Sequence, residues 1–244
     1  MKHKPHKLYH QDPLSRWLSN WYAQPQGSRV RERLRECVHR HGAPGPGDVA
    51  VELAPVPVLD ETDAPQAPVV RLAPARPAVL GNPEAWPLET GCAHRIVLAH
   101  PGAYTDRPAA VVAEAGRVLA PEGMIFVLEG NRLHLREQGG VRVSPLPEGL
   151  HRRQYRALLE AAGLEVLEQW SLSLLPPGLS ATWQKRLAGV DAWTRRGLPP
   201  LASVILTVGY KRVEHPLPPV RRFRFAPPAP GARGGLVSSR SIRY

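Results

Sequence analysis

The stretch RVLAPEGMIFVLEG, residues 117–130, constrains the fold more than any other part of the sequence. It reads as the end of an amphipathic helix, then Pro-Glu-Gly, then an apolar strand that starts at once. Proline cannot continue a helix, and glycine supplies the positive φ that a helix C-terminus favours. The pattern predicts the tight helix-to-strand connection of a β-α-β unit, with a helix over 107–123 and a strand over 124–128.

The same alternation runs through the chain. We expect further strands near residues 49–53, 68–72, 95–99, 165–171 and 202–210, and further helices near 12–27, 28–42, 151–163 and 178–197. Continuous apolar runs such as Ile96–Ala99 are typical of parallel strands that are covered on both faces. The chain is therefore predicted to be an α/β protein, with a mostly parallel sheet and helices on both faces.

Two amphipathic helices are expected before the first strand. Pro13 opens the first, with Asp12 as its N-cap, and Trp17 and Trp21 lie on its apolar side, where packing is the favoured role. Ser28 is expected to cap the second helix, and Gly42 to end it. The other face of this second helix is rich in arginine.

The net charge of +11 lies at the two ends of the chain. Residues 1–42 carry +6, residues 43–210 carry −2, and residues 211–244 carry +7. Basic ends on a near-neutral body suggest an acidic partner, namely nucleic acid, the ribosome or an anionic membrane surface. The other reading, arginine in solvated tails without a partner, is equally open.

The cysteines and histidines give no metal signature. Cys37 and Cys92 are too few and too far apart for a recognised ligand spacing, and histidines such as His39 and His41 do not stand beside carboxylates in a known motif. Two reduced thiols fit a cytoplasmic protein, which is the expected location. No apolar run is long enough to predict a transmembrane helix.

Residues 86–130 resemble the central block of class I S-adenosylmethionine-dependent methyltransferases. The compact size and the segment PLASVILTVGYKRV, residues 200–213, resemble the methyltransferase type 11 branch. The matching positions are Pro87-Leu88, Val97-Leu98, Pro108, Glu114, Arg117-Val118-Leu119 and Pro121-Glu122-Gly123. The resemblance implies a Rossmann-like, doubly wound sheet over residues 28–213, whose last strand pairs antiparallel with the one before it. It also implies S-adenosylmethionine as cofactor.

The resemblance places the cofactor site on six residues, and the chain departs from the family pattern around several of them. These six are Glu52, Ala54, Asn82, Glu84, Trp86 and His100. The family has a Gly-x-Gly loop after its first strand, whereas this chain has Ala54 followed by Pro55, Val56 and Pro57. Where the family has an acid after the second strand to hold the ribose, this chain offers Arg71 or Ala73. The catalytic residues and the oligomeric state are not indicated by the sequence.

Three segments and two functions are expected. Residues 1–27 form a basic N-terminal segment with a short helix, residues 28–213 the methyltransferase-like domain, and residues 214–244 a basic, disordered tail rich in Pro, Gly and Arg. In one hypothesis the protein is a divergent methyltransferase of unknown substrate. In the other it is an inactive methyltransferase-like module that binds an acidic partner through its basic ends.

Overall fold

The computed structural model describes residues 13–42, 45–59, 67–72, 82–130, 152–173, 181–186 and 204–212. All of them belong to the first of the two compact units into which the chain divides, Met1–Val213 and Glu214–Tyr244. The predicted disordered tail and the predicted N-cap Asp12 lie outside the described residues.

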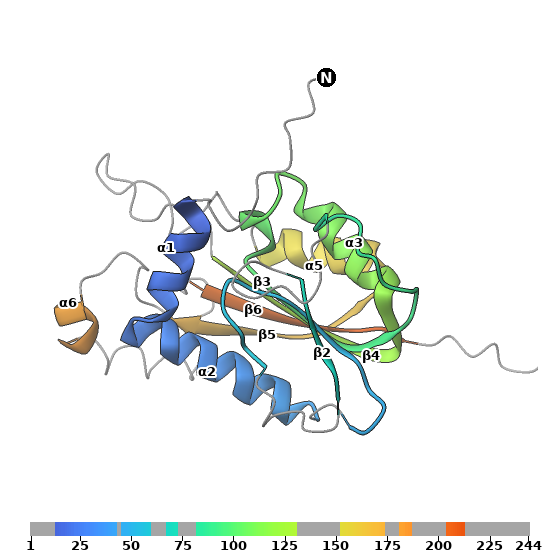
Figure 1. The fold of residues 1–244 in the computed structure, drawn as a ribbon, viewed down its shortest axis with the longest axis horizontal. Helices are drawn as coiled ribbons and strands as arrows, with labels where there is room; N and C mark the ends of the chain where they lie inside the picture. Colours follow the sequence, from blue (N-terminus) through green and yellow to red (C-terminus); the bar gives the residue numbers. More distant parts are fainter. Residues whose placement is uncertain are drawn as a thin grey trace, which may run out of the picture. The chain divides into compact units, whose positions relative to one another are not determined.

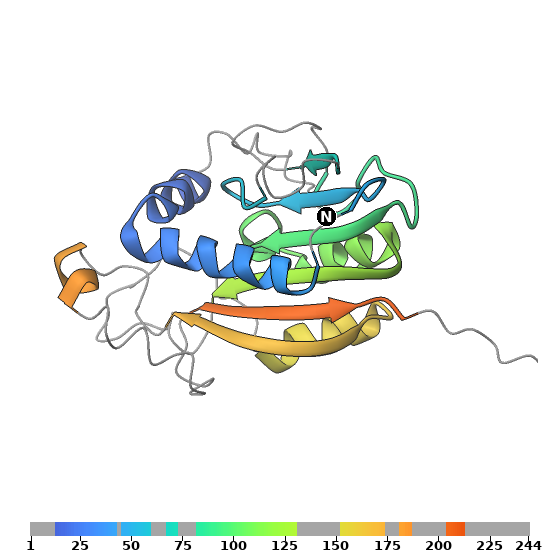
Figure 2. The same cartoon turned by 90° about the horizontal axis from the view of Figure 1, so that it is seen from below.

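The described strands form one mixed six-stranded sheet in the order β2-β1-β3-β4-β6-β5 (Figure 2). Its strands are β1 (Ala50–Leu53), β2 (Val69–Arg71), β3 (Ala93–Ala99), β4 (Leu119–Gly130), β5 (Glu165–Ser173) and β6 (Val204–Tyr210). The first four pair parallel, and β6 pairs antiparallel with both β4 and β5. The predicted strands, their mostly parallel arrangement and the antiparallel close of the sheet are confirmed.

Helices cover both faces of the sheet (Figure 1). The helices α1 (Pro13–Tyr22) and α2 (Pro25–Arg40) share a buried cluster with side chains such as Phe126 and Leu206 from one face. The helices α3 (Pro108–Val118) and α5 (Arg152–Ala161) share a second cluster with the other face. This is the Rossmann-like α/β architecture that the sequence predicts.

The N-terminal helices begin where proline sets them, and this corrects the predicted cap. Helix α2 starts at Pro25 after the N-cap residue Gln24, so Ser28 lies inside the helix and caps nothing. Proline suits the first position of a helix for two reasons. It has no N–H group, and an N–H there would have no partner within the helix; its φ is also already helical. Gly42, with φ +90, follows the helix end as predicted. The predicted boundary at residue 27 falls within the first turn of α2.

The junction of α3 and β4 differs from its prediction, because β4 already begins at Leu119. The helix already ends at Val118, and the residue with positive φ is Glu122, at +61°, rather than Gly123. Gly123 is required for space instead, because a Cβ atom there would stand 2.8 Å from the carbonyl oxygen of Ala120 and 2.9 Å from Leu119 Cδ1. The Lys211 ammonium donates to the carbonyls of Gly116 and Leu119 at 2.8 and 2.6 Å, which satisfies the end of α3.

Two short elements complete the described structure. A 3₁₀ turn at Pro101–Ala103 follows β3, and helix α6 (Ala181–Arg186) contacts α2. Only these six residues of the helix predicted over 178–197 fall within the described part. Among the described helices, none has the length and apolar character needed to cross a membrane.

Candidate cofactor site

The carboxyl ends of the parallel strands meet at one edge of the sheet, where doubly wound folds bind their ligands. Leu53 of β1 is in register with Leu98 of β3, which is in register with Val127 of β4. Three of the six predicted site residues, Glu52, Ala54 and His100, lie at this edge. This edge is therefore the candidate cofactor site.

The loop after β1 is filled by its own side chains. Ala54 and Pro55 are buried, and Val58 and Leu59 are only 2% and 1% exposed. Val56, Val58 and Leu59 belong to the same apolar cluster as Trp21 and other residues of α1 and α2. A hydrogen bond of 3.4 Å from Ser19 Oγ to the carbonyl of Pro55 adds a polar tie to α1. Helix α1 and this loop thus close over the end of β1.

The side chains at the ends of β1 and β2, beside this loop, form an ion pair. Glu52 is 2% exposed, and its carboxylate accepts a hydrogen bond from the backbone N–H of Val58. Arg71 Nε lies 3.5 Å from Glu52 Oε2, and Arg71 Nη2 donates to the carbonyl of Leu59 at 2.7 Å. The arginine therefore joins the end of β2 to both the acid and the loop of β1.

These residues do not fit S-adenosylmethionine in the way the family holds it. Two of the loop positions are prolines, which have no N–H to donate and carry a ring where close approach is needed. The acid of β1 is already paired, and β2 ends in a cation where a carboxylate would hold the ribose hydroxyls. Binding would require the loop and the pair of Glu52 and Arg71 to rearrange.

His100 is at the centre of a buried polar network at the ends of β3 and β4. Its Nε2 lies 2.9 Å from the hydroxyl of Tyr22, and its Nδ1 lies 3.4 Å from Glu129 Oε1. Tyr155 donates to Glu129 Oε2 at 2.8 Å. His100 is 0% exposed and has φ +57, a left-handed conformation that is uncommon outside glycine and recurs at functional sites.

One assignment of protons satisfies this network without a ligand. Tyr22 donates to His100 Nε2, and His100 Nδ1–H and the Tyr155 hydroxyl both donate to Glu129. Burial, together with the Glu129 carboxylate, raises the pKa of both Tyr22 and Tyr155 above the usual range of tyrosine. Both hydroxyls therefore keep their protons at neutral pH. An imidazole can serve as a general base, but both nitrogens of His100 already have hydrogen-bond partners, Tyr22 and Glu129.

The other three predicted residues lie with α3 rather than at the His100 network. Asn82 Oδ1 accepts from the N–H of Glu84 at 2.9 Å, and Glu84 pairs with Arg107 at 3.1 Å. Trp86 is buried in the cluster of α3 and α5 and donates through Nε1 to the carbonyl of Pro83 at 2.8 Å. Each has a local structural partner, and their role in cofactor binding stays a prediction.

Sequence reasoning missed Tyr22, Arg71 as a partner of Glu52, Glu129 and Tyr155. A signal existed for Glu129, since an acid that ends an otherwise apolar strand needs buried donors. No pattern indicated Tyr22, because only the docking of α1 across the sheet edge brings it to His100, 78 residues later in the chain.

Comparison with known proteins supports the fold. No protein-family model matches the sequence, and a search of curated proteins finds no relative. Among solved structures, a SAM-dependent methyltransferase from Aquifex aeolicus has a TM-score of 0.51 at 13% identity, over 80% of this chain and 98% of that chain. A chain from the complex between the Haloferax volcanii Trm112 methyltransferase activator and a methyltransferase has a TM-score of 0.50 at 14% identity, over 83% and 99%.

The fold is not confined to methyl transfer among these structures. The [4+2]-cyclase SpnF also has a TM-score of 0.50, at 15% identity, over 86% of this chain and 88% of that chain. Identities this low establish the arrangement of the backbone and carry no substrate or activity to this chain. The protein has the class I methyltransferase fold.

Proposed function

We propose that this methyltransferase-like protein does not use the family's cofactor site and acts as a binding module for nucleic acid. The observation that supports loss of the cofactor site is its closure. Glu52 accepts a hydrogen bond from Val58 N–H and pairs with Arg71, and the loop side chains Val58 and Leu59 are buried. A methyl transfer would need this edge to hold both the cofactor and a substrate.

The second half rests on the charged surface around α2 and α6. Helix α2 carries five arginines and two glutamates, and Arg31 and Arg40 are exposed. Helix α6 contacts α2 and presents Trp183, which is 52% exposed. The Arg186 guanidinium lies over the Trp183 ring, 5.6 Å from its centre, within the distance of a cation–π contact. Cations beside an exposed aromatic ring can pair phosphates and stack on unpaired bases, which favours single-stranded nucleic acid over a membrane.

Calorimetry with S-adenosylmethionine and S-adenosylhomocysteine tests the first half. We expect a dissociation constant weaker than about 1 mM, a loss of about 4 kcal/mol from a micromolar site. Micromolar binding would overturn this proposal. It would favour the alternative, a divergent S-adenosylmethionine-dependent methyltransferase of unknown substrate.

Fluorescence anisotropy with a labelled single-stranded RNA tests the second half. The double variant Lys185→Glu and Arg186→Glu should weaken binding. Each lost phosphate contact should make the negative slope of log affinity against log salt less steep by about 0.7. The matched control is Arg153→Glu and Arg156→Glu on α5, which makes the same charge change on exposed residues of the opposite face. Equal losses from both variants would mean that only net charge matters. Binding to phosphatidylserine vesicles but not to RNA would point to a membrane partner instead.

A further inference from the structure

We propose that Cys37, His41 and Glu168 form a metal site for Zn²⁺ on the face of the sheet that α2 covers. Their ligand atoms, the Cys37 thiol sulfur, an imidazole nitrogen and a carboxylate oxygen, all lie within 4.8 Å of one another. A tetrahedral Zn²⁺ with bonds of about 2.0–2.3 Å holds its ligand atoms about 3.3–3.8 Å apart, so a small adjustment suffices.

Helix geometry places two of the ligands. Cys37 and His41 are four residues apart, so they stand one turn apart on the same side of the helix end. His41 follows the last residue of α2, and its N–H still bonds to the carbonyl of Cys37 at 3.3 Å. Arg95 of β3 holds the backbone of this end by donating to the carbonyls of His41 and Gly42 at 3.3 and 3.2 Å.

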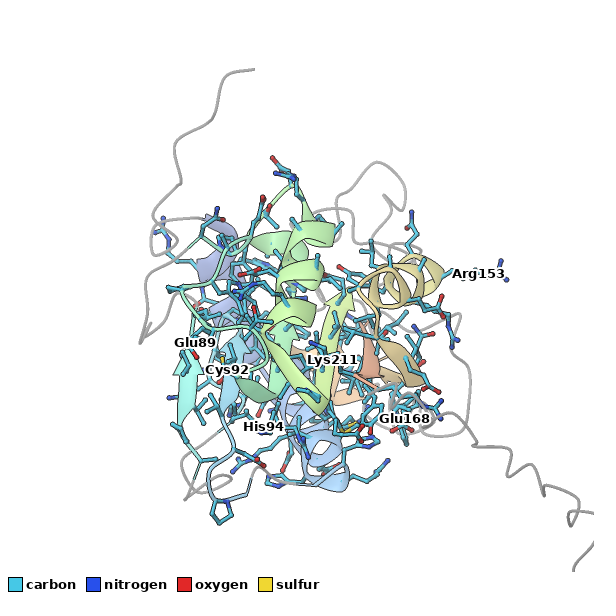
Figure 3. The ribbon with its side chains drawn as sticks, turned by 90° about the vertical axis from the view of Figure 1, so that its right-hand side faces the viewer. Glu89, Cys92, His94, Arg153, Glu168 and Lys211 are labelled. Atoms are coloured by element: carbon cyan, nitrogen blue, oxygen red, sulfur yellow. The ribbon has the colours of Figure 1, made fainter. Side chains whose placement is uncertain are left out.

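A bulge in β5 supplies the third ligand. Val166 pairs with Gly209 and Glu168 with Val208, so Leu167 is an extra residue in this strand. Val166 packs with the α3 and α5 cluster, whereas Trp170, two residues after Glu168, packs with the α1 and α2 cluster. The extra residue therefore turns Glu168 toward α2, as bulges at functional sites do. Figure 3 shows Glu168 beside this helix.

Contacts along α2 hold the helix against β5 on the way to this cluster. Gln26 Nε2 donates to Ser173 Oγ at 3.1 Å, Arg33 donates to the carbonyl of Leu172, and Arg40 lies 4.7 Å from the centre of the Trp170 ring. At the end of this series the imidazole of His41 hydrogen-bonds to the Glu168 carboxylate. The three ligands thus come from two elements that are fixed relative to each other.

The ligand set points to Zn²⁺ with one position open. A thiolate and an imidazole select Zn²⁺ over Mg²⁺ or Ca²⁺, which prefer oxygen ligands. Three protein ligands leave a fourth position for water or an exogenous ligand. Cys37 also lines a cavity of about 150 Å³, together with Arg33, Glu36, Arg40, Trp170 and Leu172. An anionic ligand reaching the metal from this cavity would meet two arginines.

Titration with Co²⁺, a spectroscopic substitute for Zn²⁺, tests the site in the full-length protein. We expect one equivalent to give a thiolate-to-cobalt charge-transfer band and tetrahedral d–d bands, which Zn²⁺ then displaces. Cys37→Ser should abolish the charge-transfer band. Glu168→Gln should keep the band and weaken affinity by about 100-fold, at least as much as loss of an outer-shell partner does. Absence of any charge-transfer band in the parent protein would overturn the proposal.

Two controls separate this site from adventitious binding. Cys92→Ser removes the other thiol, which lies on the opposite side of the view in Figure 3 from Glu168, and it should leave the band unchanged. Loss of the band in Cys92→Ser but not in Cys37→Ser would contradict the assignment. A variant with His3, His6 and His10 changed to alanine should also keep the band, because those histidines bring no thiolate. Circular dichroism of Cys37→Ser verifies that loss of the band is not loss of the fold.

Discussion

Arg71 Nε lies 3.5 Å from Glu52 Oε2, and the two residues stand in register on neighbouring parallel strands. The resemblance to methyltransferases places the ends of these two strands against the cofactor. Here one end carries an acid and the other a base, and the pair also fixes the loop that follows β1. The ion pair of Glu52 and Arg71 therefore helps to keep the candidate site closed, and substituting either residue tests this role.

Separating this pair should destabilise the protein strongly. Arg71→Met leaves the Glu52 carboxylate buried without its cation, and we expect a loss of about 3–5 kcal/mol in the free energy of unfolding. Glu52→Gln should cost less, since the amide oxygen still accepts from Val58. Urea denaturation of both single variants and the double variant measures the coupling. Additive effects would show that the pair is not coupled.

The tyrosines of the His100 network should resist ionisation until the protein unfolds. Their raised pKa means that the unfolded chain loses these protons first, so this stability is complete below about pH 10 and falls as pH rises further. Ultraviolet titration of tyrosinate should show at least two tyrosines that ionise together with alkaline unfolding. Tyr22→Phe should remove one of them.

Tyr22→Phe should also destabilise the protein at neutral pH. It leaves a buried nitrogen of His100 without its donor, at a cost of about 1–3 kcal/mol. The matched control is Tyr210→Phe, whose hydroxyl bonds to the exposed Glu122 and whose loss should cost less than about 0.5 kcal/mol. Thermal unfolding of both variants makes the comparison, and equal costs would argue against a buried network.

Glu114 should contribute to the loss of stability in acid. The hydrogen bond from Arg117 lowers the pKa of this carboxyl, the N–H of Trp86 acts in the same direction, and partial burial opposes them. A lowered pKa stabilises the fold above the unfolded value of about 4.3, and the contribution is lost as pH falls through the folded value. Glu114→Gln should therefore reduce stability at pH 7 and flatten its decline between about pH 5 and 3.

Exposed Glu89, labelled in Figure 3, is the control for that experiment. Glu89→Gln should change stability by less than about 0.5 kcal/mol at pH 7. If it flattened the acid limb as much as Glu114→Gln does, the effect would come from net charge.

Gly123→Ala should destabilise the first part of β4, close to the end of α3. The added Cβ would stand 2.8 Å from a backbone oxygen, so the backbone must shift, at a cost of about 1–3 kcal/mol. Gly45→Ala is the control, because the nearest atom to a Cβ there is Asp48 Oδ2 at 3.7 Å. Chemical denaturation should find Gly45→Ala within about 0.5 kcal/mol of the parent, and a similar result for Gly123→Ala would contradict the close contact.

Deleting residues 218–244 should weaken binding to RNA. This segment carries six arginines, no acid, and the aromatic residues Phe223, Phe225 and Tyr244. Its contribution should be electrostatic and should diminish steeply with salt through counterion release. Anisotropy at two salt concentrations measures it. Unchanged binding at both would show that the tail has no part in the interaction.

The local order of helices and strands was predictable from residues that act on their neighbours. Apolar runs such as Ile96–Ala99 define the parallel strands, and Gly42 ends α2 as predicted. The start of α2 at Pro25 was not predicted, and the capping role given to Ser28 was wrong. The charges of the ends and the departures from the methyltransferase pattern at Pro55 and Pro57 were also readable. All of these depend on propensity or on one position in a motif, which a sequence states directly.

The contacts that decide the site depend on the tertiary structure. Tyr22 reaches His100 only because α1 packs across the end of the sheet, and Arg71 reaches Glu52 only through parallel pairing of β1 and β2. Cys37 and Glu168 meet because a one-residue bulge turns a strand side chain to the other face. Each contact joins residues that are far apart in the chain, and their distances are set by packing that no local spacing encodes.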